Sequence, residues 1–274
     1  MRPTPFLDRF SADRPLVGVV HLPALPGSPA AASSVGEVRE RAVRDARVLA
    51  EGGMDGVLVE NYGDAPYPPE EAGAPTVASM AVITAAVRAA VGVPVGVNVL
   101  RNGAEAALAA AVAAEADFVR VNVWTGARLT DQGLIQGAAH RVLRMRRCLE
   151  ADVAVLADVA VKHSAPVTER PLAEEAAEAV GRGRADGLLV TGSATGLPPD
   201  PERLEAVRRA AGGRPVLAAS GVTPENAHHL VAGADGAVVG TALKEGGETS
   251  APVERDRVQA LVEAARGPAT EGLS

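Results

Sequence analysis

The chain has 274 residues, of which 47% are hydrophobic and 22% are charged, and its formal net charge is −7. A chain of this length can bury one large core, and its single cysteine, Cys148, excludes an intramolecular disulfide and a multi-cysteine zinc cluster. It contains no run of about 20 apolar residues, no signal-peptide core and no basic stripe interleaved with aromatic residues. We therefore expect a cytoplasmic protein that does not insert into a membrane or bind nucleic acid.

Short valine-rich runs recur along the chain and alternate with alanine-rich segments of helical period. Each run is too short for a helix and is typical of a buried parallel strand. The eight runs span residues 16–21, 56–60, 94–99, 118–123, 154–159, 187–190, 215–218 and 236–240.

Helix-start signals lie in the segments between these runs. Two are capping-box patterns, and two place proline at the first helical position. They are Ser34 with Glu37, Asn102 with Glu105, Asp200 before Pro201, and Thr223 before Pro224.

The cycle of strand and helix repeats eight times. Eight such units in about 250 residues fit a closed (β/α)₈ barrel or a doubly wound open sheet. No Gly-x-Gly-x-x-Gly follows the first run, so we favour the barrel. It should occupy residues 15–266, with residues 1–14 as a peripheral N-terminal extension and residues 267–274 as a C-terminal tail.

Three strand-to-helix connections are unusually long, at residues 22–33, 61–75 and 124–136. In a barrel all three open on the C-terminal face, where active sites lie. Their aromatic residues, Tyr62, Tyr67 and Trp124, are candidates for either a pocket lid or a subunit interface. A homo-oligomer is expected from base rates alone.

Polar residues interrupt the valines of the fourth run. The period of two directs Arg120 and Asn122 into the barrel, near its upper rim. A buried arginine needs an anion, which would be either a ligand or a carboxylate such as Glu60 or Asp158.

Polar side chains also stand at the ends of other runs, and a closed barrel brings such ends together. For any one of these residues, a purely structural role is the alternative to a catalytic one. Their joint placement at strand ends favours general acid/base chemistry and substrate binding. They are His21, Glu60, Asn61, Asn98 and Asp158.

Lys162 and His163 follow Asp158 in the loop after the fifth run. Lysine occurs only here and at Lys244, whereas arginine supplies every other cationic side chain. A lysine beside a carboxylate serves as an electrostatic clamp or, with a lowered pKa, as a base or nucleophile. The position of Lys162 beyond the strand end favours the electrostatic clamp. The alternative is that Lys162 and His163 are simply solvated loop residues.

Small and hydroxyl-bearing residues follow the sixth, seventh and eighth runs. Phosphate-binding barrels place such residues there so that backbone N–H groups can hold the phosphate, although ordinary turns have the same composition. The candidates are Thr191 for substrate, and Gly192, Ser220, Gly221, Gly240 and Thr241 for phosphate; we call the last four the phosphate cradle.

Metal ligation has weak support. The only adjacent histidines, His228 and His229, lie within a helical segment and cannot face one ion together. We predict no cofactor and no metal, with Mg²⁺ on Glu60, Asp64 or Asp158 as the remaining alternative.

The chain resembles the BtpA family in several segments. They read VGVVHLPALPGSP at 17–29, GVLVENYGD at 56–64, GVNVLRN at 96–102, FVRVN at 118–122, ADV at 157–159, VKH at 161–163 and ASGV at 219–222. The resemblance implies a phosphate-binding (β/α)₈ barrel, a family member tied to photosystem I accumulation and relatives among sugar-utilisation genes. Ala160 departs from the polar residue that relatives often carry there.

These observations predict an enzyme acting on a small phosphorylated sugar or nucleoside-type substrate. Asp158, Glu60, Lys162 and His163 would be catalytic, in an isomerase, a lyase, or a glycosyl hydrolase or transferase. The alternatives are a non-catalytic assembly factor for a photosynthetic complex and a phosphate-ligand sensor.

Overall fold

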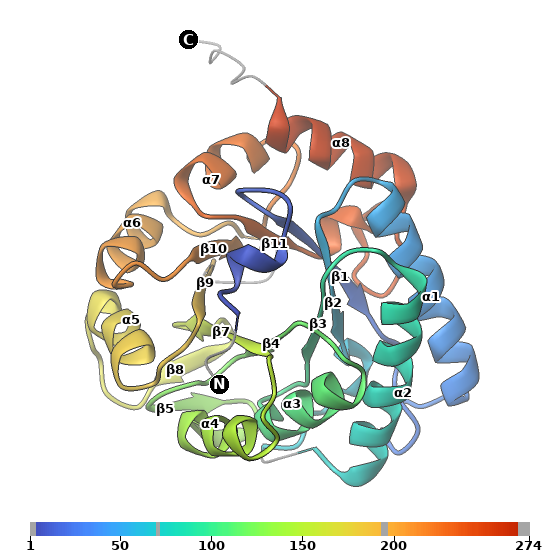
Figure 1. Ribbon diagram of the computed structural model, residues 1–274, viewed down its shortest axis with the longest axis horizontal. Helices are drawn as coiled ribbons and strands as arrows, with labels where there is room; N and C mark the ends of the chain where they lie inside the picture. The colour runs from blue at the N-terminus through green and yellow to red at the C-terminus, as the bar shows by residue number, and fades with distance from the viewer. Residues whose placement is uncertain (1–3, 70–71, 193–196, 268–274) are drawn as a thin grey trace.

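The computed structural model describes residues 4–69, 72–192 and 197–267. Eight parallel strands form the barrel: β1 (Leu16–His21), β2 (Gly56–Glu60), β3 (Val95–Asn98), β4 (Phe118–Val121), β7 (Ala154–Val159), β9 (Gly187–Thr191), β10 (Val216–Ala219) and β11 (Ala237–Val239). They close in the order β1-β11-β10-β9-β7-β4-β3-β2 (Figure 1). The predicted (β/α)₈ barrel is confirmed.

Eight α-helices form the outer ring (Figure 1). They are α1 (Val35–Glu51), α2 (Ala74–Ala90), α3 (Ala104–Ala113), α4 (Ala139–Cys148), α5 (Leu172–Gly181), α6 (Pro201–Ala210), α7 (Ala227–Gly233) and α8 (Arg255–Arg266). Four 3₁₀ turns accompany them: η1 (Leu7–Arg9), η2 (Tyr62–Asp64), η3 (Thr241–Leu243) and η4 (Glu245–Gly247). Within the described ranges, none of the helices combines the length and apolarity needed to cross a membrane.

Two of the predicted helix starts are confirmed. Ser34 and Glu37 form the reciprocal capping box of α1, and Asp200 accepts a hydrogen bond from the backbone N–H of Glu202.

The two other predicted starts are wrong. The Asn102 side chain bonds the backbone N–H and C=O of Val123, because tertiary contact with the next loop replaces local capping. Helix α7 begins only after Asn226, whose side chain bonds the Thr223 N–H and the Gly221 carbonyl.

The side chains of each strand alternate between two cores. Val119 and Val121 of β4 pack against the helix ring, whereas Phe118 joins the cluster that fills the barrel. Arg120 and Asn122 follow Phe118 at a spacing of two and point inward, as predicted. The inward register places polar residues above an apolar floor.

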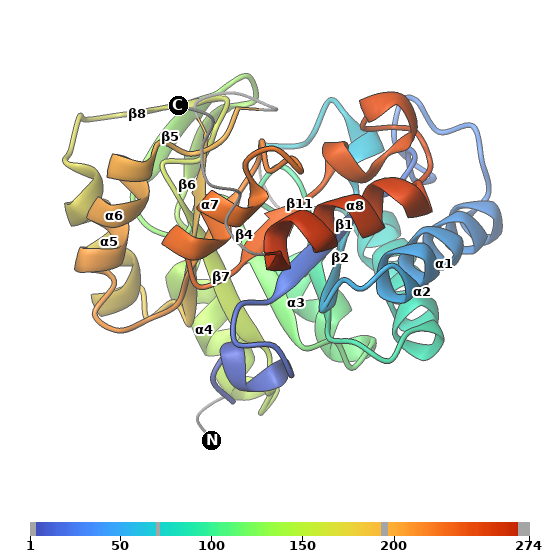
Figure 2. The same ribbon diagram turned by 90° about the horizontal axis from the view of Figure 1, so that it is seen from above.

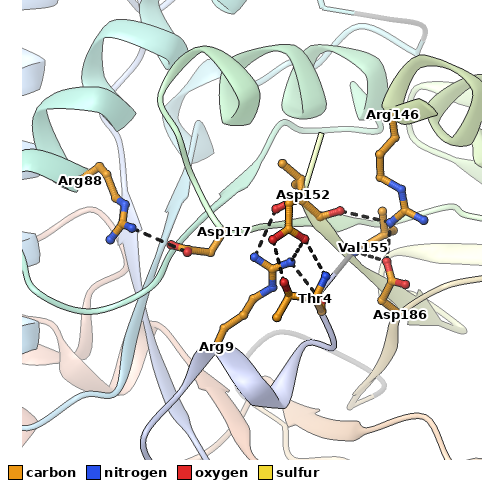
Figure 3. Close-up of polar contacts among 9 residues, drawn as sticks. Thr4, Arg9, Arg88, Asp117, Arg146, Asp152, Val155 and Asp186 are labelled. Carbon is orange, nitrogen blue, oxygen red and sulfur yellow. Dashed lines mark hydrogen bonds and ion pairs between the residues drawn. The ribbon is translucent and has the colours of Figure 1, made fainter. Parts of the chain in front are cut away.

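The N-terminal segment closes the end of the barrel at which the strands begin. This finding corrects the expectation of a peripheral extension. Phe6 is 1% exposed and packs edge-to-face on Phe118, with ring centroids 5.4 Å apart. Asp152 holds this segment by accepting hydrogen bonds from Thr4 and Arg9 (Figure 3). Burial of an aromatic ring outweighs the cost of ordering the chain.

A repeated aspartate contact organises the same end. Just before every second barrel strand, an aspartate accepts a backbone N–H at the start of the preceding strand. The same aspartate pairs with an arginine from the helix that comes before this preceding strand around the ring, which for β1 is α8. The four sets are Asp55 with Leu16 and Arg266, Asp117 with Val95 and Arg88, Asp186 with Val155 and Arg146, and Asp235 with Val216 and Arg208. Figure 3 shows the ion pair of the second set and all three residues of the third. The barrel therefore consists of four similar quarters, each of two strands and two helices.

A small antiparallel sheet, absent from the sequence prediction, lies at the opposite end (Figure 2). It joins β5 (Ala127–Thr130), β6 (Gly133–Gln136) and β8 (Ser164–Pro166) in the order β6-β5-β8. The long connection after β4 thus pairs with the loop after β7, a contact that no local pattern reveals.

Candidate active site

A cavity of about 550 Å³ opens at the C-terminal ends of the strands. Ten of the predicted site residues line it together. They are His21, Glu60, Arg120, Asn122, Lys162, His163, Ser220, Gly221, Gly240 and Thr241.

Arg120 forms the floor of this cavity and pairs with Asp158. Its Nε and Nη2 donate to the two carboxylate oxygens, each at 2.9 Å, and Asn122 donates to the same carboxylate at 2.8 Å. The nearest contact to Glu60 is longer, at 3.8 Å between Nη1 and Oε2. Of the two partners left open by the sequence, a carboxylate within the barrel is therefore the one present.

Glu60 is buried on the cavity wall between Arg120 and His21. Burial raises the pKa of Glu60, although Arg120 and Lys162 oppose the shift. Burial, followed by the charges of Lys244, Lys162 and Arg120, holds the pKa of His21 well below its ordinary value, so the imidazole is neutral. Its Nε2 lies 3.7 Å from Glu60 Oε1. A carboxyl group with a raised pKa is suited to transfer a proton near neutral pH.

Cationic side chains gather on the β3 and β7 side. Arg101, three residues beyond the end of β3, donates from Nη2 to the Lys162 carbonyl at 2.6 Å. Burial, with the Arg120 charge as the next cause, lowers the pKa of Lys162. Burial and Lys162 also lower the pKa of His163. These groups can stabilise negative charge on a bound molecule.

The phosphate cradle residues meet on the β10 and β11 side. A Cβ on Gly240 would lie 2.7 Å from Cε1 of His21, so only glycine lets the imidazole lie against this strand end. Gly221 has a φ of +61°, and its missing side chain leaves room for the backbone at Leu197 and Pro198. Thr241 Oγ1 lies 2.8 Å from Thr249 Oγ1. The cradle is thus lined by glycines and hydroxyl groups.

Five predicted site residues do not line this cavity. Asp158 is enclosed by Arg120 and Asn122, and its neighbouring cavity, of about 210 Å³, lies outside the main one. Asn98 donates to the Arg120 carbonyl, and Asn61 bonds Asp64 and the Leu100 N–H, so both amides support the fold. The remaining two are Thr191, fully buried, and Gly192, which packs under Leu197; residues 193–196 of that loop lie outside the described residues.

The aromatic residues of the long connections lie in two different places. Tyr62 and Tyr67 line the cavity, and the Tyr67 hydroxyl donates to the Tyr62 carbonyl at 2.6 Å. Trp124 is 1% exposed and donates to the Gly183 carbonyl, so it belongs to the core rather than to a lid or an interface.

The two lysines also differ. Lys162 faces the cavity, whereas Lys244 is fully buried behind it, with Nζ 3.7 Å from Asp45 Oδ2. Burial lowers the pKa of Lys244 to about 8, against the opposing charge of Asp45.

Sequence reasoning missed five polar residues of the cavity: Arg101, Thr223, Glu225, Thr249 and Arg257. Arg101 lies three residues beyond the end of β3, so its position near a strand end is a weaker form of the signal that identified Glu60 and Asn61. Arg257 lies on α8 and carries no local signal.

Two of the three carboxylates considered for magnesium are engaged elsewhere. Asp64 accepts from Leu25 N–H and Asn61, and Asp158 accepts from Arg120 and Asn122. Among the described residues, no three histidine, cysteine, aspartate or glutamate side chains gather as a ligand set.

Comparison with known proteins assigns this barrel to a family. Residues 12–267 match the BtpA family. The chain belongs to the BtpA family. It is 44% identical over 255 residues to the photosystem I biogenesis protein BtpA of Synechocystis sp., covering 93% of this chain and 89% of that protein. The resemblance stated from the sequence motifs is confirmed.

Solved structures share the fold of this BtpA-family chain. N-(5′-phosphoribosyl)anthranilate isomerase from Pyrococcus furiosus has a TM-score of 0.55 at 14% identity, covering 92% of this chain and 98% of that one. An archaeal fructose 1,6-bisphosphate aldolase has a TM-score of 0.54 at 16% identity, covering 95% and 97%. At these identities the likeness concerns the fold alone.

Proposed function

We propose that this BtpA-family protein is an enzyme that acts on a small phosphorylated sugar or nucleoside-type substrate by general acid/base catalysis. The observation that carries the proposal is the position of Glu60. Its carboxyl group, buried and with a raised pKa, lies on the wall of the same cavity that the phosphate cradle lines.

In this proposal the cradle binds the phosphate through Ser220, Gly221, Gly240 and Thr241. Glu60 moves a proton at the reacting carbon, with neutral His21 beside it. Lys162 and His163 stabilise the negative charge that develops on the substrate oxygen.

Isomerisation or aldol-type cleavage fits this arrangement better than glycosidic chemistry. Most glycosidases use two carboxyl groups on opposite sides of the scissile bond. Asp158 is bound by Arg120 and Asn122 outside the main cavity, and the other carboxyl group on the cavity lining, Glu225, is exposed to solvent. Several solved structures with this fold are sugar-phosphate aldolases or isomerases, which is consistent with the proposal.

The test begins with thermal unfolding in the presence of sugars and nucleosides, each offered with and without phosphate. A ligand at 100 times its Kd stabilises the folded state by about 2.7 kcal/mol. Selective stabilisation by phosphorylated compounds is expected, and Glu60→Gln should then abolish turnover of those compounds while retaining their binding. Stabilisation by neither member of any pair would refute the proposal.

A second candidate function is a non-catalytic role in assembly of a photosynthetic complex, as the name of the Synechocystis relative indicates. A groove beside α4 favours it, because Arg144, Arg147, Arg182 and Arg184 gather there, outside the active-site cavity. Among the described residues these four arginines form no ion pair with a carboxylate. Deleting these charges would impair complex assembly under this candidate and leave turnover unchanged under the first.

A further inference from the structure

Arg101 is a buried arginine whose guanidinium has no carboxylate partner within the described part of the chain. It is 7% exposed, lines the cavity and makes one hydrogen bond, from Nη2 to the Lys162 carbonyl. A buried cation without a counter-ion is costly, and a single neutral carbonyl compensates it poorly. The site therefore favours an anion that a ligand supplies.

Lys162 adds a second positive charge at the same place. Its side chain lines the cavity and forms no hydrogen bond or ion pair with any described residue. Arg120, the third cation of this region, is already bound by both oxygens of Asp158. The β3 and β7 side of the cavity thus carries an excess of positive charge.

Arg101 lies across the barrel from the part of the phosphate cradle that follows β10. In the ring of eight strands, β3 is four strands from β10, the greatest possible separation. Arg101 follows β3, and Ser220 and Gly221 follow β10. One molecule that spans the cavity would therefore contact both regions.

We propose that Arg101 and Lys162 form a second anion site, so that the substrate carries phosphate at one end and a second anionic group, carboxylate or phosphate, at the other. The proposal rests on the proposed function, because the cradle holds the first phosphate. Arg101 can form paired hydrogen bonds to either group, while Lys162 contributes a point charge.

Binding of inorganic phosphate tests whether two anion sites exist. Equilibrium dialysis should give two phosphate ions per wild-type chain and one per Arg101→Gln chain. Arg39→Gln removes an exposed arginine of α1 outside every proposed site and serves as the control, which should retain two. If Arg101→Gln does not fold, Lys162→Met tests the same site, because that side chain has no described partner to lose.

A matched series of ligands then distinguishes the two chemical sources. Glucitol 6-phosphate, 6-phosphogluconate and glucitol 1,6-bisphosphate have the same open six-carbon chain and differ only at C1. Wild type should bind one or both doubly anionic compounds about 10- to 100-fold more tightly than glucitol 6-phosphate. Arg101→Gln should lose this preference and keep its affinity for glucitol 6-phosphate.

The outcomes separate this inference from the proposed function. A wild type that binds one phosphate and shows no preference within the series overturns the second anion site and leaves the proposed function standing. A wild type that binds neither phosphate nor any phosphorylated compound removes the proposed function, and the second site with it. Equal loss of affinity for all three compounds in Arg101→Gln also overturns the second site.

Discussion

Arg120 and Asp158 form a bidentate ion pair inside the barrel, linking β4 to the adjacent β7 through two hydrogen bonds of 2.9 Å. The pair joins two side chains that the sequence offered for separate tasks, ligand binding and proton transfer. Asp158 neutralises Arg120 and positions it beside Glu60, which remains the buried carboxyl group that faces the cavity.

Breaking this pair should destabilise the protein. Asp158→Leu leaves Arg120 buried without its main counter-ion, and we expect a loss of about 3–5 kcal/mol in the free energy of unfolding, measured with urea. The double variant Arg120→Met/Asp158→Leu removes both charges and should recover much of that loss. A double variant no more stable than Asp158→Leu would contradict this account.

The pH dependence of stability should report Glu60. Its pKa in the folded protein lies above the ordinary value of 4.5, so the folded state binds the proton more tightly than the unfolded state does. The contribution of this proton to stability is present below about pH 4.5 and is lost as pH rises through the folded pKa. Comparing urea unfolding of wild type and Glu60→Gln across this range should show curves that diverge with pH, whereas parallel curves would exclude the shift.

Gly240→Ala should disturb the site through His21. The closest contact of a Cβ added at Gly240 is the imidazole of His21, with Cε1 at 2.7 Å. We expect a loss of about 1–3 kcal/mol and weaker binding of phosphorylated ligands. Gly92→Ala is the control, because a Cβ there meets nothing within 4 Å. Similar behaviour of the two variants would show that His21 moves aside freely.

The aspartate contacts at the N-terminal end of the barrel should support folding rather than function. Asp186→Ala removes the acceptor of the buried Val155 N–H and the partner of Arg146, and should cost about 1–3 kcal/mol for the orphaned donor alone. Glu205→Ala, which breaks an exposed pair with Arg209, should change stability by no more than about 0.5 kcal/mol. Ligand binding should survive in both variants, and its loss in Asp186→Ala would refute a purely structural role.

Local patterns were sufficient to predict the barrel and much of the cavity wall. Strand and helix periods, turn residues and the alternation of side chains act within a few residues, so the inward direction of Arg120 and Asn122 followed from spacing alone. The closure of parallel strands then brings their polar ends together, which is why ten predicted residues share one cavity.

Contacts between distant segments required the tertiary structure. The capture of Arg120 by Asp158, the entry of Phe6 into the barrel and the pairing of β5 with β8 each depend on which segments become neighbours. Arg101 shows the same limit, since its sequence position places it after a strand but cannot show that its guanidinium is buried beside Lys162 without a carboxylate. The sequence by itself determined which side chains point inward, and the folded chain decided which charges remain for a ligand, because pairing is a property of distance in space.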